Sequence, residues 1–186
     1  AEEDDVGTRQ IGAASELGRD LRDVLVERAF PVSQWRLYDE ADTIVALDDE
    51  EQARAIRPID GADLAGADIV FFCGGAEQTA RFIGSSELDG VVIDLGQTLA
   101  LRDDVALVVP EVNADIVESA IDERLLATPL PAATALAVAL SPIEQSVRLR
   151  RLTVTCLEPV SSSAGGIQEL ARQTGDLLSG REPEPL

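Results

Sequence analysis

Two cysteines are the residues of this chain best suited to nucleophilic chemistry, and the sequence contains no histidine to serve as their base. Cys73 and Cys156 each lie in an apolar, strand-like run, where a cysteine is typically a small buried hydrophobe. No serine has a histidine beside which it could act as a nucleophile. Acidic clusters such as 48–51 are typical of solvated loops rather than of a metal site. The sequence therefore offers no catalytic pair and no metal site.

A second pattern concerns phosphate binding. Gly12 and Gly18 fall between a candidate strand at 7–11 and a helical pattern, as in the G-x-x-G-x-x-G turn that cradles a dinucleotide pyrophosphate. The middle glycine is replaced by Ser15, whose Cβ crowds the phosphates, and Glu16 places a negative charge where the helix should receive an anion. Two interpretations follow: a weakened dinucleotide site, or glycines that shape the turn and let the helix pack.

An acid at the end of the next strand bears on the cofactor. Asp39 lies 21 positions after Gly18, near the offset at which an acid accepts a ribose 2′-hydroxyl. Such an acid favours NAD and repels the 2′-phosphate of NADP; the alternative is a solvated loop charge. Gly74 and Gly75, which end a buried strand, complete the candidate cofactor-binding set. We expect no bound cofactor, or NAD with low affinity.

Composition limits the partners. The 186 residues carry 35 acidic and 15 basic side chains, a net charge of -20, which repels phosphate backbones and anionic membranes. We therefore expect neither a nucleic-acid nor a membrane partner; the charge otherwise indicates solubility or a high-salt source. The start shows no secretory apolar region, and the longest apolar stretch, 132–140, is too short to span a bilayer. The simplest expectation is a cytoplasmic, reduced protein.

Apolar periodicity predicts the elements that would position these residues. Continuous apolar runs bounded by turn signals alternate with helical patterns, which favours a doubly wound parallel α/β sheet of Rossmann type. The predicted strands are 7–11, 35–38, 43–47, 68–73, 91–95 and 106–109. The predicted helices of this part are 17–29 and 77–84.

The pattern changes after residue 131. A helical stripe begins at Ala133, and Pro142 is expected to kink or end it. A β-branched strand at 152–157 and an amphipathic helix at 164–178 follow. One strand and one helix cannot form a sheet domain alone. We therefore expect either that residues 150–186 pack on the first domain or on a partner, or that the chain is a truncated version of something longer.

Five sequence segments together resemble the aspartate-semialdehyde dehydrogenases. Residues 25–33 resemble the family's "ERxFPVS", 71–75 its "FFSAGG" and 91–94 the start of "VVIDNSSAFR", while 108–113 and 166–174 resemble segments on either side of the active-site loop. Residues 169–183 resemble the Usg-like branch of that family. The resemblance runs through nearly the whole chain and corresponds to about the N-terminal half of a usual member. It implies a Rossmann-like NAD(P)-binding domain at 1–131 and part of a catalytic and dimerisation domain at 132–186.

The departures from this family all affect the chemistry. The resemblance places Pro131 at the position of the nucleophilic cysteine and Glu158 at the position of the active-site glutamine. The family's phosphate-binding arginine corresponds to Ala100, and Arg102 could substitute only if the loop shifts. The family's histidine base belongs to a region beyond the part resembled here. Cys156 is either buried filler or a relocated nucleophile.

Three functions remain open from the sequence. The first is a catalytically inactive, Usg-like binding or assembly subunit that forms a homo-oligomer or binds a protein partner through residues 150–186. The second is a NAD(P)-dependent semialdehyde dehydrogenase of amino-acid biosynthesis, which requires a nucleophile and a base that we cannot assign. The third is a sensor that binds a dinucleotide without turning it over.

Overall fold

The structure is a computed structural model that describes residues 6–45, 55–60, 64–83, 88, 90–120, 124–160 and 166–183. It divides into two compact units, Ala1–Arg148 and Leu149–Leu186, whose mutual placement is not determined. The helix that follows residue 130 is therefore grouped with the first unit by its contacts. The division between family domains after residue 131, which rests on the resemblance, stays a prediction.

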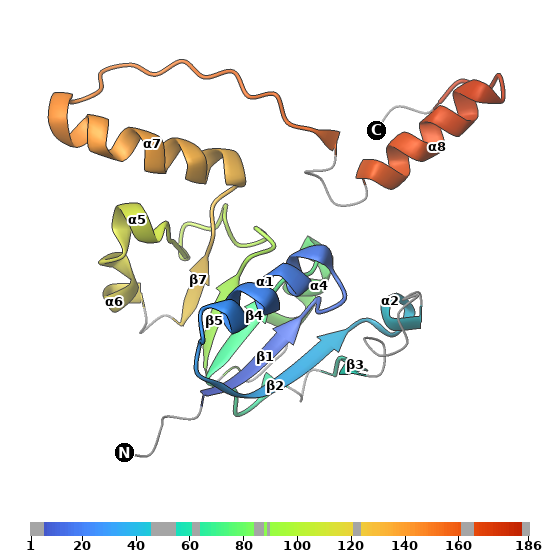
Figure 1. Cartoon of the computed structure of the whole chain (residues 1–186), viewed down its shortest axis with the longest axis horizontal. Helices are drawn as coiled ribbons and strands as arrows, with labels where there is room; N and C mark the ends of the chain where they lie inside the picture. The colour runs from blue at the N-terminus through green and yellow to red at the C-terminus, as the bar shows by residue number, and fades with distance from the viewer. Residues whose placement is uncertain are drawn as a thin grey trace. The chain divides into compact units, whose positions relative to one another are not determined.

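A seven-stranded sheet forms the centre of the first unit (Figure 1). Its order is β3-β2-β1-β4-β5-β7-β6, and every neighbouring pair is parallel. The predicted Rossmann-like α/β class is thus confirmed. The strands are β1 (Val6–Ile11), β2 (Val32–Asp39), β3 (Ile56–Pro58), β4 (Ile69–Phe72), β5 (Val91–Asp94), β6 (Ala106–Leu107) and β7 (Leu125–Ala127).

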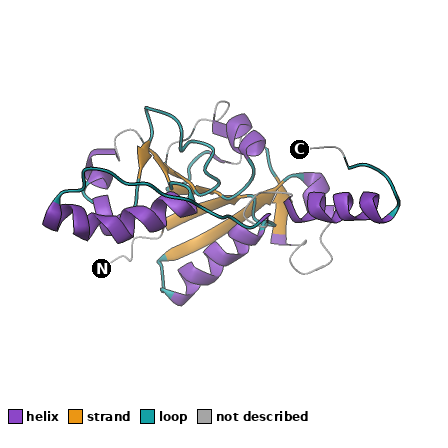
Figure 2. Ribbon diagram, turned by 90° about the horizontal axis from the view of Figure 1, so that it is seen from above, coloured by secondary structure: helices purple, strands orange, loops and turns teal. Residues whose placement is uncertain are grey.

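Helices cover both faces of this sheet, as the view from above shows (Figure 2). Neighbouring residues of β1 point to opposite faces: Gln10 donates to the Gly18 carbonyl of α1, while Ile11 packs in a cluster with Phe82 of α4. The described helices of this unit are α1 (Glu16–Glu27), α2 (Ala41–Val45), α4 (Ala76–Ile83), α5 (Pro110–Asn113), α6 (Ile116–Ala120) and α7 (Pro131–Val147).

In the first unit one local prediction is wrong, and of the two effects predicted for Pro142, to kink or to end its helix, the second is excluded. A strand was expected at 43–47, but α2 occupies Ala41–Val45, and residues 46 and 47 lie outside the described part. The Ile44 amide donates to the Glu40 carbonyl, so this short segment closes a helical turn directly after β2. Pro142 does not end its helix, because α7 continues to Val147. A proline in a helix interior removes one hydrogen bond, which the remaining turns of this 17-residue helix tolerate.

The second unit contains an extended segment and α8 (Gly166–Leu178), which confirms the predicted helix. The predicted strand at 152–157 is wrong: these residues pair with no strand in the described structure. Cys156 is exposed there, which contradicts its interpretation as buried filler. A β-branched sequence favours extended backbone, but strand structure also needs a neighbour to accept its hydrogen bonds.

Candidate functional site

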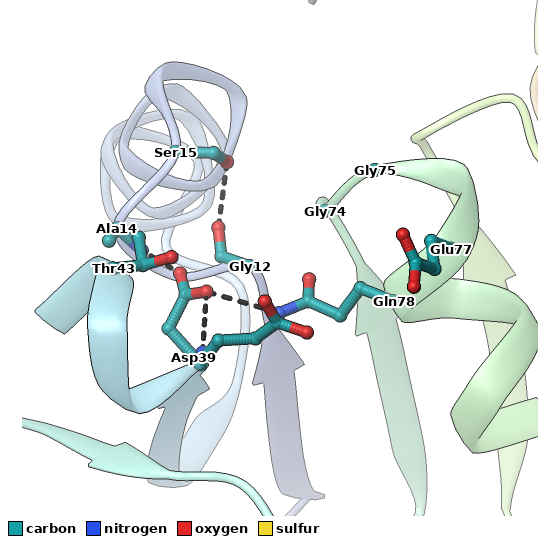
Figure 3. Close-up of a pocket in the computed structure, with 10 residues that line it drawn as sticks. Gly12, Ala14, Ser15, Asp39, Thr43, Gly74, Gly75, Glu77 and Gln78 are labelled. Carbon is teal, nitrogen blue, oxygen red and sulfur yellow. Dashed lines mark hydrogen bonds between the residues drawn. The ribbon is translucent and has the colours of Figure 1, made fainter.

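A cleft of about 320 Å³ opens at the carboxyl ends of β1, β2 and β4 (Figure 3). The chain runs from β1 to β2 on one side and returns to β4 on the other, so the strand order reverses at β1. Ligands of doubly wound sheets bind at such a reversal. The lining residues are Gly12, Ala14, Ser15, Asp39, Glu40, Thr43, Gly74, Gly75, Glu77 and Gln78.

Backbone glycines meet across the floor of this cleft. Gly12 has a φ of +74°, and a Cβ there would lie 2.3 Å from the Gly74 amide nitrogen. A Cβ on Gly96, which follows β5, would lie 2.4 Å from the Gly74 carbonyl oxygen. The loops after three neighbouring strands therefore touch backbone to backbone, which only glycine permits at these points.

Ser15 and Gly18 attach α1 to this floor. Ser15 is the N-cap residue of α1: its Oγ accepts from the Gly18 amide at 2.9 Å and donates to the Gly12 carbonyl at 2.7 Å. A Cβ on Gly18 would lie 2.5 Å from the Gly12 carbonyl oxygen, so Gly18 is a packing glycine. Both residues thus have structural roles that need no ligand.

Asp39 ends β2 with its carboxylate inside the cleft, only 4% exposed. This burial contradicts the interpretation of Asp39 as a solvated loop charge. Its Oδ2 accepts from the Ala14 amide at 2.8 Å, and its Oδ1 accepts from the Glu40 amide at 2.8 Å. The register of β1 and β2 therefore carries the acid to the glycine turn, as the sequence offset predicted.

Gln78 is one of the lining residues that the sequence analysis missed, and its side chain contacts Asp39. It lies in α4, is 7% exposed, and its Nε2 donates to Asp39 Oδ1 at 3.1 Å. Figure 3 shows this side chain reaching from α4 towards β2. Its role depends on the strand order, because the first turn of the helix after Gly74 and Gly75 faces the point where that order reverses.

The charges around the cleft are unfavourable for phosphates. Among the ten described residues that line it, Asp39, Glu40 and Glu77 are acidic and none is basic. Arg81 lies nearby, but its guanidinium is 3.0 Å from the Glu40 carboxylate and 3.8 Å from that of Glu77. The cleft thus has the shape of a dinucleotide site and, in Asp39, an acid where a ribose hydroxyl would bind. Its acidic lining and the serine that caps α1 do not fit a tightly held pyrophosphate.

Asp94 organises the neighbouring loops at the end of β5. Its side chain is fully buried and accepts from the amides of Gly96 at 3.0 Å and Leu99 at 2.7 Å. Burial raises the pKa of this carboxyl above its ordinary value, against the lowering effect of these hydrogen bonds. The Thr128 amide donates to the Asp94 carbonyl at 3.0 Å, so the same residue also fixes the segment that leads into α7.

Pro131 is the first residue of α7 and is exposed. Proline is favoured there because the first amide of a helix has no intrahelical partner. The segment before it leaves the carboxyl end of β7, which pairs with β5, so Pro131 follows the same edge of the sheet as the glycine loops. The position that the resemblance assigns to the nucleophile thus carries no reactive atom.

The two thiols differ sharply in environment. Cys73 is buried beneath the glycine loops, where Gln10 Nε2 lies 3.6 Å from its Sγ, and burial raises its pKa to about 11. Such a thiol is almost fully protonated at neutral pH and a poor nucleophile. Cys156 and Glu158 are exposed in the second unit, whose position relative to the cleft is not determined.

The remaining predictions from the sequence concern a phosphate-binding arginine, a metal site and a membrane span. Arg102 is exposed and its Nε donates to Asp104 Oδ1 at 2.9 Å, so its guanidinium is held within its own loop. No three histidine, cysteine or acidic side chains form a metal-binding group in the described ranges. None of the described helices is long and apolar enough to cross a membrane.

Comparisons with known proteins agree with this geometry. Residues 10–120 match the family described as "Semialdehyde dehydrogenase, NAD binding domain". The chain is 34% identical over 178 residues to a USG-1 protein homolog of Azotobacter vinelandii, covering 94% of the chain and 53% of that protein. It is 29% identical over 178 residues to an aspartate-semialdehyde dehydrogenase of Rickettsia bellii, covering 94% and 53%.

A solved structure gives the same result in three dimensions. Aspartate semialdehyde dehydrogenase II of Vibrio cholerae, complexed with ASA, superposes with a TM-score of 0.79 at 28% identity, covering 99% of this chain and 56% of that one. The chain thus spans about half the length of the relatives it matches. From its sequence match, its strand order and its glycine-lined cleft, the chain belongs to the semialdehyde dehydrogenase NAD-binding domain family.

Proposed function

We propose that this chain is a catalytically inactive relative of the aspartate-semialdehyde dehydrogenases that acts as a binding or assembly subunit. The observation that carries the proposal is Pro131, exposed at the first turn of α7. A helix N-terminus is where a thiolate would be stabilised, because the helix dipole and the free amides lower a cysteine pKa. A proline ring has neither a lone pair for a carbonyl carbon nor an amide hydrogen.

The cysteines present support this reading. Cys73 is sealed under the glycine turn with a raised pKa. Cys156 is accessible, but it does not lie at the position of the family's nucleophile. The named dehydrogenases among the relatives favour the alternative of an active NAD(P)-dependent semialdehyde dehydrogenase. That alternative requires Cys156 to act as a relocated nucleophile.

Nucleotide binding belongs to the proposal in a weak form. Asp39 is positioned to accept from ribose hydroxyls and to repel a 2′-phosphate, which favours NAD over NADP. Glu40 and Glu77 oppose the pyrophosphate, and the Ser15 hydroxyl already caps α1 where the phosphates would approach. We therefore expect NAD to bind with low affinity and NADP with lower affinity still.

The activity assay is the direct test of this proposal. We expect no oxidation of aspartate semialdehyde with phosphate and NAD or NADP, and no reduction of aspartyl phosphate with NADH or NADPH, above the rate without protein. The physical reason is the loss of the nucleophile at position 131, without which no covalent intermediate can form. Absorbance of the reduced nicotinamide measures both directions, and an active family member serves as the positive control.

The variant Cys156→Ser is the matched control, because it removes the one exposed thiol and leaves the first unit untouched. Turnover by the native chain that disappears in Cys156→Ser would establish a relocated nucleophile and overturn the proposal.

The proposed partner surface is the apolar side of the second unit. Ile167, Leu170, Leu177 and Leu178 recur at helical spacing on α8 and are 51–85% exposed. Arg172 forms ion pairs with Glu169 and Asp176 along the same helix, at 2.7 and 2.9 Å. Each large apolar side chain that becomes buried contributes about 1.5–3 kcal/mol, so covering the four gives a strong drive to associate. We propose a second copy or a protein partner as the cover.

Light scattering on the purified chain tests this surface. We expect a mass above that of the monomer, falling towards the monomer in the double variant Leu170→Gln, Leu177→Gln. Glu182→Gln, which is exposed beyond the end of α8, is the control and should not change the mass. If the native chain stays monomeric across a wide concentration range, a second copy of the chain is excluded as the partner.

A further inference from the structure

We propose that Gln78 is a specificity-determining residue that closes the nucleotide cleft from within, its amide occupying the acceptor that a ribose hydroxyl would need. The inference rests on the proposed function, because it concerns the cleft of a domain expected to bind NAD weakly. It assigns part of the weak NAD binding to one side chain, in addition to the effects of the glycine turn and of the surrounding acidic charge.

The carboxylate of Asp39 already accepts several hydrogen bonds within the protein. Its two oxygens accept three donors: the Ala14 amide on Oδ2, and the Glu40 amide and Gln78 Nε2 on Oδ1. The first two donors belong to the backbone and are fixed by the β1–α1 turn and by the end of β2. The Gln78 amide is the one side chain among these donors, so it is the contact that a ligand or a substitution can displace.

The Gln78 amide lies between the Gly74 backbone and Asp39. A Cβ built on Gly74 would lie 1.7 Å from Gln78 Oε1, so the amide group rests directly against the Gly74 backbone. From there it reaches Asp39, across the carboxyl end of β1 (Figure 3). The side chain therefore spans the line between the loops after β4 and β2, where the strand order reverses and a nucleotide would enter.

The electrostatics explain why this arrangement is stable without a ligand. A buried carboxylate needs donors, and no basic side chain lies among the described residues that line the cleft. Gln78, itself 7% exposed, supplies a neutral donor and gains a partner for its own amide. A ribose hydroxyl that donates to Asp39 Oδ1 at this position must first displace the Gln78 amide. This displacement lowers the affinity for any nucleoside at the site.

Calorimetric titration with NAD tests the inference. We expect Gln78→Ala to bind NAD at least tenfold more tightly than the native chain, because the substitution frees the acceptor position on Asp39 Oδ1 that Gln78 occupies and opens the space beside Gly74. NADP should gain little, since the freed carboxylate repels a 2′-phosphate. Gln145→Ala is the matched control: it makes the same substitution at an exposed position of α7 that does not line the cleft, so it should leave the affinity for NAD unchanged.

Two further variants keep the test decisive. Gln78→Ser shortens the side chain but keeps it polar, and it replaces Gln78→Ala if the alanine variant unfolds. The double variant Gln78→Ala, Asp39→Asn should lose the gain, provided that circular dichroism shows it folded. Affinity for NAD unchanged in folded Gln78→Ala or Gln78→Ser, or a gain equally large in Gln145→Ala, would overturn the inference.

The outcomes separate this inference from the proposed function. No gain in the Gln78 variants, with weak native binding and no turnover, overturns the role of Gln78 and leaves the inactive subunit standing. A gain that is accompanied by turnover of aspartate semialdehyde supports the role of Gln78 and overturns catalytic inactivity.

Discussion

Replacing Gly12 with alanine is expected to lower the free energy of unfolding of the first unit by about 3 kcal/mol or more. The φ of +74° is unfavourable for any residue with a Cβ, and the new methyl group would lie 2.3 Å from the Gly74 amide nitrogen. That neighbour is backbone, so it cannot rotate away. Either the β1–α1 turn or the β4–α4 turn must move.

Urea unfolding followed by tryptophan fluorescence measures this effect, since Trp35 in β2 is the one tryptophan of the chain. Gly75→Ala is the control, because a Cβ at Gly75 meets no atom within 4 Å in the described structure and should leave stability nearly unchanged. If Gly12→Ala unfolds at the same urea concentration as Gly75→Ala, the close contact of the two turns is incorrect.

Replacing Asp94 with alanine is expected to destabilise the first unit by about 2–4 kcal/mol. The substitution leaves the amides of Gly96 and Leu99 without their acceptor, and Leu99 is itself buried. Asp94→Asn should cost less, since one oxygen remains, but its amide nitrogen then faces a donor. The order of stability is therefore native, asparagine, alanine.

The same urea experiment separates these variants. Asp103→Ala, an exposed acid that lies nine positions on, controls for the loss of one negative charge in a chain of net charge -20. An alanine variant as stable as the native chain would show that the carboxylate does not hold the loop.

Much of the fold was predictable because a buried parallel strand needs an apolar sequence. The runs at 68–73 and 91–95 match β4 and β5, whose described neighbours cover both faces. β3 and β7 were missed because each has only three residues, too few to show a periodic pattern. In β3, Ile56 is the one buried residue, and the arginine and proline that follow it do not suggest a strand. The false strand at 152–157 shows the opposite limit, because pairing depends on a neighbour that local sequence does not reveal.

The candidate site was predictable where chemistry depends on sequence offset. Gly12, Gly18 and Asp39 were found because a strand, a turn and a helix of ordinary length place them together. Gln78 was missed because its role comes from the sheet order, which brings α4 beside β2 through β1 and β4. The second role of Ser15, as an N-cap, also appears only when its Oγ is seen beside the Gly18 amide.

Covalent trapping tests the central claim, the absence of a nucleophile, most directly. The native chain is incubated with aspartate semialdehyde and NAD without phosphate and is then digested. The masses of its two cysteine-containing peptides are measured by mass spectrometry. A working thiolate would add to the aldehyde carbonyl, and the resulting thiohemiacetal would pass its carbon-bound hydride to NAD, leaving an acyl thioester that hydroxylamine cleaves. The account predicts unmodified peptides at Cys73 and Cys156; a hydroxylamine-labile acyl group on either cysteine would contradict it.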